Sequence, residues 1–158
     1  GCGLGGKESL DQIRRVMPPV SGPFTLTHNA IQRATTNLGH HQPLQGLTGA
    51  VHGAAWCRLD GSIMRVCEDV GRHNALDKLI GSLWGENCLQ GPGFLLMSSR
   101  ASYEIVQKAA KAGIAVVATL SAPTSMAIDL AAGAGMTLIG FARESRHLAY
   151  CHAHRLTD

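Results

Sequence analysis

The sequence predicts an α/β protein, built as a three-layer α/β/α sandwich around a mixed β-sheet. Apolar strand-like runs alternate with amphipathic helix-like runs along most of the chain. Some of these runs, such as residues 114–118, are apolar throughout, which is typical of interior strands covered by helices on both faces. Asp60-Gly61 stands between two other strand-like runs and indicates a hairpin, so we expect an antiparallel pair followed by parallel strands.

Turn residues and periodicity set the bounds of each predicted element. Residues 39–43 hold a glycine, two histidines and a proline, and we expect them to end the first helix in a solvated turn. Ser102 is expected to cap a later helix, and Gly113 to end it. The predicted helices are residues 24–37, 74–84, 102–112 and 123–132, and the predicted strands are residues 51–58, 62–67, 94–97, 114–120, 136–141 and 147–151.

Length and composition indicate one compact domain. The chain has 158 residues, of which 45% are hydrophobic and 16% are charged. We expect residues 1–22 to form a flexible, glycine-rich N-terminal segment that carries Cys2, and residues 23–158 to form a single α/β/α domain.

The same composition argues against several functional classes. No apolar run reaches the roughly 18 to 20 residues of a membrane helix, and no secretory signal opens the chain. We therefore expect a cytoplasmic protein with no membrane partner. The net charge of +3 is mild and does not by itself indicate nucleic acid as a partner.

The cysteines give no metal-binding or redox motif. They stand at positions 2, 57, 67, 88 and 151, without a Cys-x-x-Cys pair, and His52 lacks the glutamate of a zinc deaminase signature. No metal site is predicted, and Cys57 and Cys67 are expected to be inert core thiols. Cys2 lies in a glycine-rich loop with Lys7 nearby, which suits a reactive thiol, although a disordered terminus accounts for the same pattern.

Polar residues gather where the predicted strands end. The most informative cluster is residues 68–78, and further clusters follow at 98–104, 121–125 and 140–143. Ligands of such sheets bind at the carboxyl ends of parallel strands, and arginines beside helix N-termini suit phosphate. Helix capping accounts for any single cluster, whereas the four together favour an anion-binding site. His52 and His73 are either buried core histidines or members of that site.

The last sixteen residues are rich in arginine and histidine. They include Arg143, Arg146 and Arg155, and they either form a basic face for an anionic ligand or a solvated tail.

Four motifs, taken in order, resemble the FdhD family of formate dehydrogenase accessory sulfurtransferases. They are TGAVHGAA (residues 48–55), EDVGRHNALDK (68–78), SSRASYEIVQK (98–108) and SAPTS (121–125). The resemblance runs from Cys2 to the region of Arg146. It implies a core similar to that of cytidine deaminase and usually a homodimer. It also implies a further N-terminal β-rich domain, to which nothing in this chain corresponds.

The resemblance implies a sulfur carrier. Such a protein receives persulfide sulfur from a cysteine desulfurase and passes it to a molybdenum (or tungsten) bis(molybdopterin guanine dinucleotide) cofactor bound for formate dehydrogenase. Cys2 is then the implied persulfide carrier, and GDP-like nucleotides would mimic the cofactor. The implied cofactor-binding segment is Phe141, Ala142, Arg143, Glu144, Ser145 and Arg146.

Residues outside that segment are assigned to the same pocket as a hypothesis. Arg72 and Arg100 are expected to line it, while Glu68 and Asp69 either bind guanine N–H groups or anchor Arg72.

The chain departs from the family in its cysteine loop. The family loop is typically Cys-Gly-x-Cys-Gly, whereas this chain keeps Cys2 and has Gly5 at the second cysteine position. Because Cys2 is kept, the leading hypothesis is a sulfurtransferase that also holds the cofactor. A guanine-nucleotide or molybdenum-cofactor binding module without transfer activity is the alternative, and a purely structural domain comes third.

Overall fold

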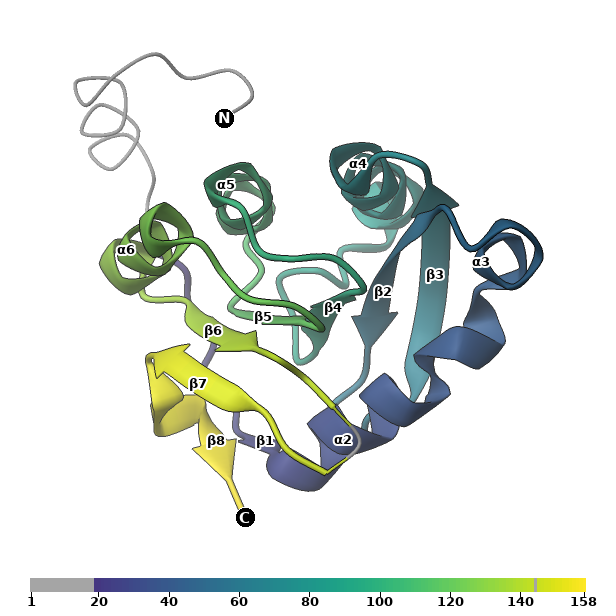
Figure 1. Ribbon diagram of the computed structural model, residues 1–158. Helices are drawn as coiled ribbons and strands as arrows, with labels where there is room; N and C mark the ends of the chain where they lie inside the picture. Colours follow the sequence, from purple (N-terminus) through teal and green to yellow (C-terminus); the bar gives the residue numbers. More distant parts are fainter. Residues whose placement is uncertain (1–18, 144) are drawn as a thin grey trace.

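The computed structural model describes residues 19–143 and 145–158, and a six-stranded mixed sheet lies at its centre (Figure 1). Strands β4, β5 and β6 are parallel, and β2 and β7 run antiparallel to their neighbours. The spatial order is β3-β2-β4-β5-β6-β7. The strands are β2 (His52–Cys57), β3 (Ile63–Asp69), β4 (Phe94–Met97), β5 (Val116–Thr119), β6 (Thr137–Gly140) and β7 (Leu148–Cys151).

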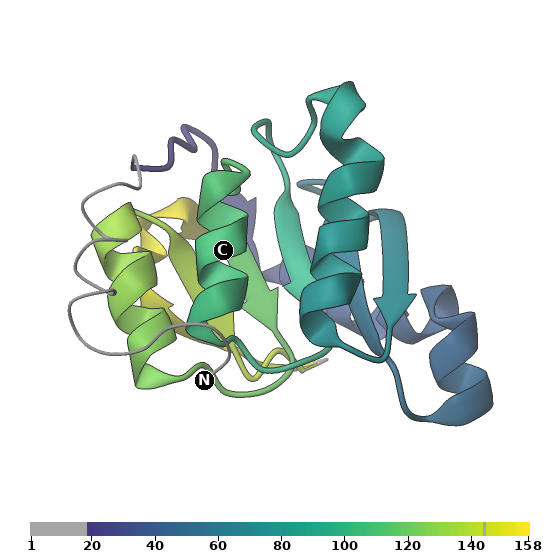
Figure 2. The same ribbon diagram turned by 90° about the horizontal axis from the view of Figure 1, so that it is seen from above.

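Helices cover both faces of this sheet, which confirms the predicted three-layer architecture. One face carries α4 (Arg72–Leu83), α5 (Tyr103–Lys111) and α6 (Ser125–Ala134) side by side (Figures 1 and 2). The other face carries α2 (His28–Asn37) and a two-stranded parallel sheet. That small sheet consists of β1 (Leu26–Thr27) and β8 (Leu156–Thr157).

Burial on both faces explains the continuous apolar runs of the sequence. In β4, Leu95 and Met97 pack into the core under α4 to α6, whereas Phe94 and Leu96 pack into the core on the α2 side. All four side chains have no exposed surface. Each fully buried side chain of this size contributes about 1.5–3 kcal/mol through the hydrophobic effect.

The predicted hairpin joins β2 and β3 and is fixed to α2. Asp60 Oδ1 accepts a hydrogen bond of 2.8 Å from the Ser62 backbone N–H, and Gly61 has a φ of 85°. A Cβ atom at position 61 would lie 2.3 Å from the carbonyl oxygen of Ala30 in α2. Glycine is therefore required both by the turn and by its close approach to the helix.

The first predicted helix, residues 24–37, is too long. Leu26 and Thr27 instead pair with the C-terminal strand β8, and the helix begins at His28. Thr27 Oγ1 accepts a 3.1 Å hydrogen bond from Ala30 N–H and caps the helix, which the apolar periodicity could not show.

The segment predicted as a solvated turn is helical. It forms a 3₁₀ turn (Leu38–His41) followed by α3 (Pro43–Thr48), which lies beside β3 (Figure 1). Pro43 fits the first turn of a helix, where a backbone N–H has no partner within the helix. Short 3₁₀ turns also follow α4 and β7, at Trp84–Glu86 and Ala153–Arg155.

The other helix bounds differ by one or two residues from the predictions. Helix α4 begins at Arg72, two residues earlier than predicted, and α6 begins at Ser125 with Thr124 as its cap. Ser102 occupies the N-cap position of α5, but its side chain makes no capping hydrogen bond. The described helices include none that is long and apolar enough to cross a membrane.

The described part of the predicted N-terminal segment contacts the domain. The backbone N–H of Val20 donates to the carbonyl oxygen of Ala134 at 2.9 Å, and the Arg155 Nε donates to that of Gly22 at 3.1 Å. Residues 1–18, including Cys2 and Gly5, lie outside the described residues.

Candidate functional site

The four polar clusters meet at one end of the central sheet. Strand β3 is antiparallel to β2, and β2 is antiparallel to β4, so β3, β4, β5 and β6 all point the same way. Their carboxyl ends therefore lie together, as expected from the strand-end clusters. We call the turns that follow them the rim, defined as residues 69–73, 98–102, 120–124 and 141–143.

The turn after β6 is held tightly against β5. The N–H of Phe141, whose φ is 52°, donates to Ser121 O at 3.3 Å, and the N–H of Ala142 donates to Thr119 O at 2.9 Å. Ala142 is fully buried, while the Phe141 side chain is 40% exposed. The apolar ring therefore stands at the surface of the rim, where a planar ligand can pack on it.

Arg143 lies across the ends of two strands. Its Nη1 donates to the carbonyl oxygens of Leu120 and, at 3.1 Å, Ala142, and its backbone N–H donates to Arg146 O at 2.8 Å. The side chains of Arg143, Ser145 and Arg146 are exposed, whereas Glu144 lies outside the described residues. Both side-chain bonds of Arg143 use Nη1, so the Nε and Nη2 side of the guanidinium suits an anion.

A histidine pair fixes the chain just after this turn. His147 Nε2 lies 2.7 Å from His28 Nδ1 at the start of α2, and the two rings stack with centroids 4.9 Å apart. Burial, and to a lesser degree His28, lower the pKa of His147. His147 is therefore neutral at pH 7.

The acidic residues of the first cluster support the backbone. Glu68 accepts hydrogen bonds from the N–H groups of Leu44 and Gln45 at 3.0 and 2.9 Å, and so caps α3. Asp69 lies 2.6 Å from Lys78 Nζ and accepts from Gly71 N–H, and these contacts lower the pKa of Asp69 to about 2. Asp69 thus anchors Lys78 and the turn. Of the two alternatives expected of Glu68 and Asp69, anchoring of Arg72 is not seen among the hydrogen bonds and ion pairs of the described residues, and binding of guanine stays a prediction.

The side chains around His73 do not form a catalytic triad. Ser102 Oγ and Glu104 Oε2 lie 3.5 and 4.0 Å from the same ring nitrogen, Nε2 of His73. A serine–histidine–carboxylate relay needs the hydroxyl and the carboxylate on opposite nitrogens. Burial first, and Arg72 second, lower the pKa of His73, so the ring is neutral at pH 7.

Arg72 and Arg100 both lie at the rim, as their positions after β3 and β4 predict. Arg72 is half-buried at the first residue of α4, and its Nε has no hydrogen-bond partner among the described residues. Arg100 is exposed.

A pocket of about 430 Å³ opens beside these turns, with no Lys, Arg, Asp or Glu in its lining. Its Leu120 accepts the hydrogen bond from Arg143, so the pocket adjoins the predicted cofactor-binding segment. Two residues that the sequence analysis singled out line it, His52 and Ser98 of the 98–104 cluster. The lining residues are Gln42, Gln45, Gly49, Ala50, Val51, His52, Ser98 and Leu120.

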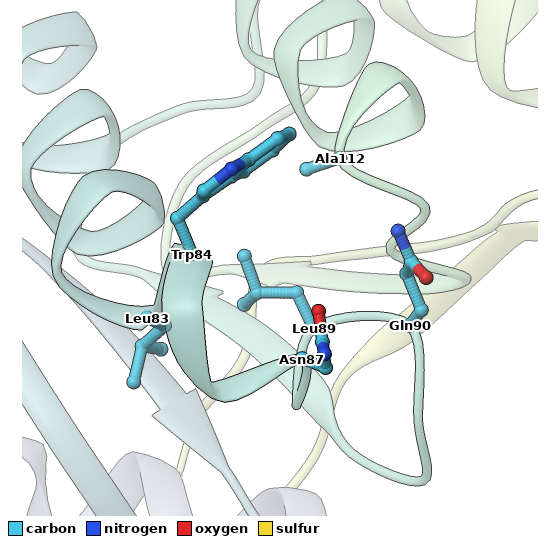
Figure 3. Close-up of a pocket in the computed structure, with 6 residues that line it drawn as sticks. All are labelled: Leu83, Trp84, Asn87, Leu89, Gln90 and Ala112. Carbon is cyan, nitrogen blue, oxygen red and sulfur yellow. The ribbon is translucent and has the colours of Figure 1, made fainter.

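A second pocket lies at the opposite end of the sheet, under the exposed ring of Trp84 (Figure 3). Its volume is about 40 Å³, which suits a water molecule and no nucleotide. It is lined by Leu83, Trp84, Asn87, Leu89, Gln90 and Ala112.

The described thiols differ in burial. Cys57 is fully buried, and this burial raises the pKa of its thiol far above the usual range. Burial also raises the pKa of Cys151, whose Sγ donates to Met136 O at 3.3 Å. Cys67 and Cys88 are only partly buried, so the prediction of a core thiol is confirmed for Cys57 more fully than for Cys67. Within the described residues, no three His, Cys, Asp or Glu side chains group closely enough to hold a metal ion.

Fold and site together define a class of protein: an α/β/α sandwich whose candidate ligand site lies at the carboxyl ends of parallel strands. The particular family follows from comparison with known proteins. The model of the FdhD/NarQ family matches residues 1–157, and the chain belongs to that family.

Individual relatives agree with this assignment. The sulfur carrier protein FdhD of Xanthomonas euvesicatoria pv. vesicatoria is 47% identical over 156 residues, covering 99% of this chain and 56% of that protein. The protein of the same name from Cupriavidus necator is 49% identical, covering 99% of this chain and 54% of the relative. The chain thus spans about half the length of the curated relatives that it matches.

A solved structure shows the same fold. It is named as that of a formate dehydrogenase accessory protein from Desulfotalea psychrophila, and is 27% identical with a TM-score of 0.84. The match covers 92% of this chain and 62% of the other chain.

Proposed function

We propose that this chain carries sulfur for the maturation of formate dehydrogenase. The observation that carries the proposal is that relatives named sulfur carrier protein FdhD match 99% of the chain at nearly half identity. The proposed donor is a cysteine desulfurase, and the proposed acceptor is the molybdenum bis(molybdopterin guanine dinucleotide) cofactor destined for formate dehydrogenase. A homodimer and a cytoplasmic location remain predictions.

The proposed carrier is Cys2. Its thiolate attacks the terminal sulfur of the desulfurase persulfide, the S–S bond of the donor breaks, and the donor leaves as a thiolate. Cys2 then holds the persulfide. In the second step the terminal sulfur passes to the metal of the cofactor, which supplies the electron pair that makes it a sulfide ligand, and Cys2 returns to a thiolate. The raised pKa values of Cys57 and Cys151 argue against either thiol as the carrier.

The rim is the proposed holding site for the cofactor. Arg143 and Arg146 would pair with its phosphates, and Phe141 would pack against a base. The half-buried Arg72, whose Nε has no partner among the described residues, would add a donor next to the N-terminus of α4.

Intact mass spectrometry tests the transfer directly. The chain is incubated with a cysteine desulfurase and cysteine, and the expected result is a gain of one sulfur atom that reductant removes. Cys2→Ala should abolish this gain, while Cys67→Ala and Cys88→Ala should retain it. A Cys2→Ala chain that gains sulfur as the wild type does would refute the carrier role.

Gly5 favours a second candidate, a cofactor-binding module that transfers no sulfur. In that case GDP binds the chain, whereas no persulfide forms on Cys2 under any donor condition. The variant Gly5→Cys restores the family pattern and distinguishes the sulfur carrier from the binding module. If a persulfide forms on Cys2 only in this variant, transfer requires the second thiol, and the chain with Gly5 is a binding module.

A further inference from the structure

Two histidines from distant parts of the chain are joined where the connection between β6 and β7 meets α2. This connection carries Arg143 and Arg146, and it runs from the sheet to the start of α2 (Figure 1). There His147 Nε2 lies 2.7 Å from His28 Nδ1, and the two rings stack at an interplanar angle of 23°. The pair therefore ties the segment with the two arginines to the first residue of a helix.

The two ends of this connection are held by different kinds of bond. At the β6 end, the backbone N–H groups of Phe141 and Ala142 donate to carbonyl oxygens near the end of β5, and these bonds do not titrate. At the β7 end, the contact is made by two imidazoles, whose hydrogen bonding depends on their protonation. Only the second attachment can respond to pH.

The geometry of the pair leaves no place for a further proton. At 2.7 Å, one hydrogen fits between the two facing nitrogens. The other ring nitrogen of His147, Nδ1, is buried and has no hydrogen-bond partner among the described residues. A proton added to His147 leaves an N–H at this position.

A proton added to His28 has the same result. The cationic ring carries hydrogen on both nitrogens, so its Nδ1–H must donate to Nε2 of His147, and the hydrogen of His147 then lies on the buried Nδ1. A buried N–H without an acceptor costs about 1–3 kcal/mol. Protonation of either ring therefore opposes the contact.

We propose that the His28–His147 pair is a proton-sensitive latch, which holds Arg143 and Arg146 in place for an anionic ligand while both rings are neutral and releases them when a proton is added. The inference rests on the proposed cofactor site at the rim and deepens it by naming how that site is regulated. His28 and His147 are positioning residues, since they act through the two arginines.

The surroundings of the pair favour neutral rings. Burial first, and the charge of His28 second, lower the pKa of His147. Arg146 precedes His147 in the chain, and Asp158 follows β8, which pairs with β1 next to His28. Neither of these charges contributes to the lowered pKa. The latch should therefore open as the pH falls below the usual histidine value of about 6.5.

The latch and simple electrostatics predict opposite effects of acid on binding. If the ligand binds the chain with the latch closed, the bound state holds fewer protons, and the affinity falls with the pH. Cationic imidazoles near Arg143 and Arg146 would instead strengthen the binding of an anion at low pH. The sign of the change thus distinguishes the two accounts.

Calorimetric titration with GDP-mannose tests the sign. Both phosphates of this probe are esterified, so its charge is constant between pH 5 and 7.5. The wild type should bind it at least about threefold more weakly at pH 5 than at pH 7.5. The double variant His28→Gln with His147→Gln keeps hydrogen-bonding side chains that take up no proton, so it should lack this fall. His73, whose pKa is also lowered, is shared by both chains.

The matched control is His154→Gln. This histidine is exposed and follows β7 at the end of the sheet opposite the rim, so its replacement should leave the fall in affinity as in the wild type. Circular dichroism at both pH values verifies that each chain is folded.

Hydrogen exchange of the wild type without ligand tests the latch independently of any variant. The Arg143 N–H, which donates to Arg146 O at 2.8 Å, should lose protection at pH 5 after correction for the intrinsic rate. The Ala142 N–H, which is bonded to Thr119 O, should keep its protection.

Several results would overturn the latch. They are an affinity that rises on acidification, an equal fall in the wild type and the double variant, and unchanged protection of Arg143 at pH 5. GDP-mannose binding that is the same at both pH values would overturn the latch alone, because the proposed cofactor site would stand. A wild type that binds no GDP-mannose at either pH would overturn the cofactor site and the latch together.

Discussion

The two ends of the central sheet use arginine in opposite ways. At the rim, Arg143 is exposed, and its side-chain hydrogen bonds to the described residues go to carbonyl oxygens of its own turn and of the β5 end. At the other end, Arg155 is 6% exposed and donates to Gly22 O, Gly135 O and Thr137 Oγ1. The sequence left a basic C-terminal face and a solvated tail as alternatives, and both are wrong for Arg155, which is buried and joins Gly22 to the start of β6.

The difference places the stabilising hydrogen bonds of Arg155 and the proposed binding site at opposite ends of the sheet. Parallel strands place their polar turns at one end, where backbone N–H groups and arginines remain open to a ligand. The opposite end is tied together by hydrogen bonds such as those of Arg155, and the pocket beside Trp84 at that end is small (Figure 3). Mutations at the Arg155 end should therefore change the free energy of unfolding, whereas mutations at the rim should change the affinity for the ligand.

The largest effect is expected at the end of the sheet opposite the rim, where Arg155 lies. Arg155→Ala leaves two partly buried carbonyl oxygens and the buried Thr137 hydroxyl without their donor, and should lower the free energy of unfolding by roughly 3 kcal/mol. Urea unfolding followed by circular dichroism measures the free energy of unfolding. Arg143→Ala is the matched control and should change the same quantity by less than about 1 kcal/mol. Equal losses in both variants would remove the distinction between the two ends.

The next effect is expected at the rim. Arg143→Ala and Arg146→Ala should each weaken GDP binding by about tenfold, since each removes a charged donor for phosphate. Calorimetric titration at fixed ionic strength measures the affinity, and Arg58→Ala, in the exposed hairpin, provides a surface control. If Arg58→Ala weakened binding as much as Arg143→Ala, net charge and not the rim would explain the affinity.

The smallest effect is a pH dependence at the His28–His147 pair. The pKa of His147 is lowered in the folded chain, so the folded state binds fewer protons than the unfolded state as the pH falls below about 6.5. Stability from this pair is thus present above that pH and is lost as the pH falls through the folded pKa. Unfolding between pH 7.5 and 5 should show a shallower fall in His147→Gln than in the wild type. The pKa of His73 is also lowered, so His73 should add the same pH dependence of stability to the wild type and to His147→Gln.

The sequence predicted the parts of the fold that local patterns determine. Strand β4 was predicted at its observed bounds, Phe94–Met97, because a run buried on both faces is apolar throughout. Helix α3 was missed because its first N–H groups are capped by Glu68, a residue of another element. The β1–β8 pair was missed because two-residue strands from opposite ends of the chain carry no periodic signal.

The part of the candidate site that depends on the direction of the strands could be predicted from the sequence. Polar clusters after four strands indicated the rim, including Arg72, Arg100 and Arg143, once those strands were taken as parallel. Gln42 was not selected, because the glycine, two histidines and proline of residues 39–43 predict a solvated turn. Only the packing of Gln42 against Gly53 shows that its side chain is buried.

Amide hydrogen exchange with and without saturating GDP tests the central distinction most directly. The account predicts slower exchange in residues 42–53, 98–102, 120–124 and 141–147, with no change around Trp84 at the opposite end. Slower exchange confined to residues 83–90, or no change at the rim while GDP is bound, would contradict it.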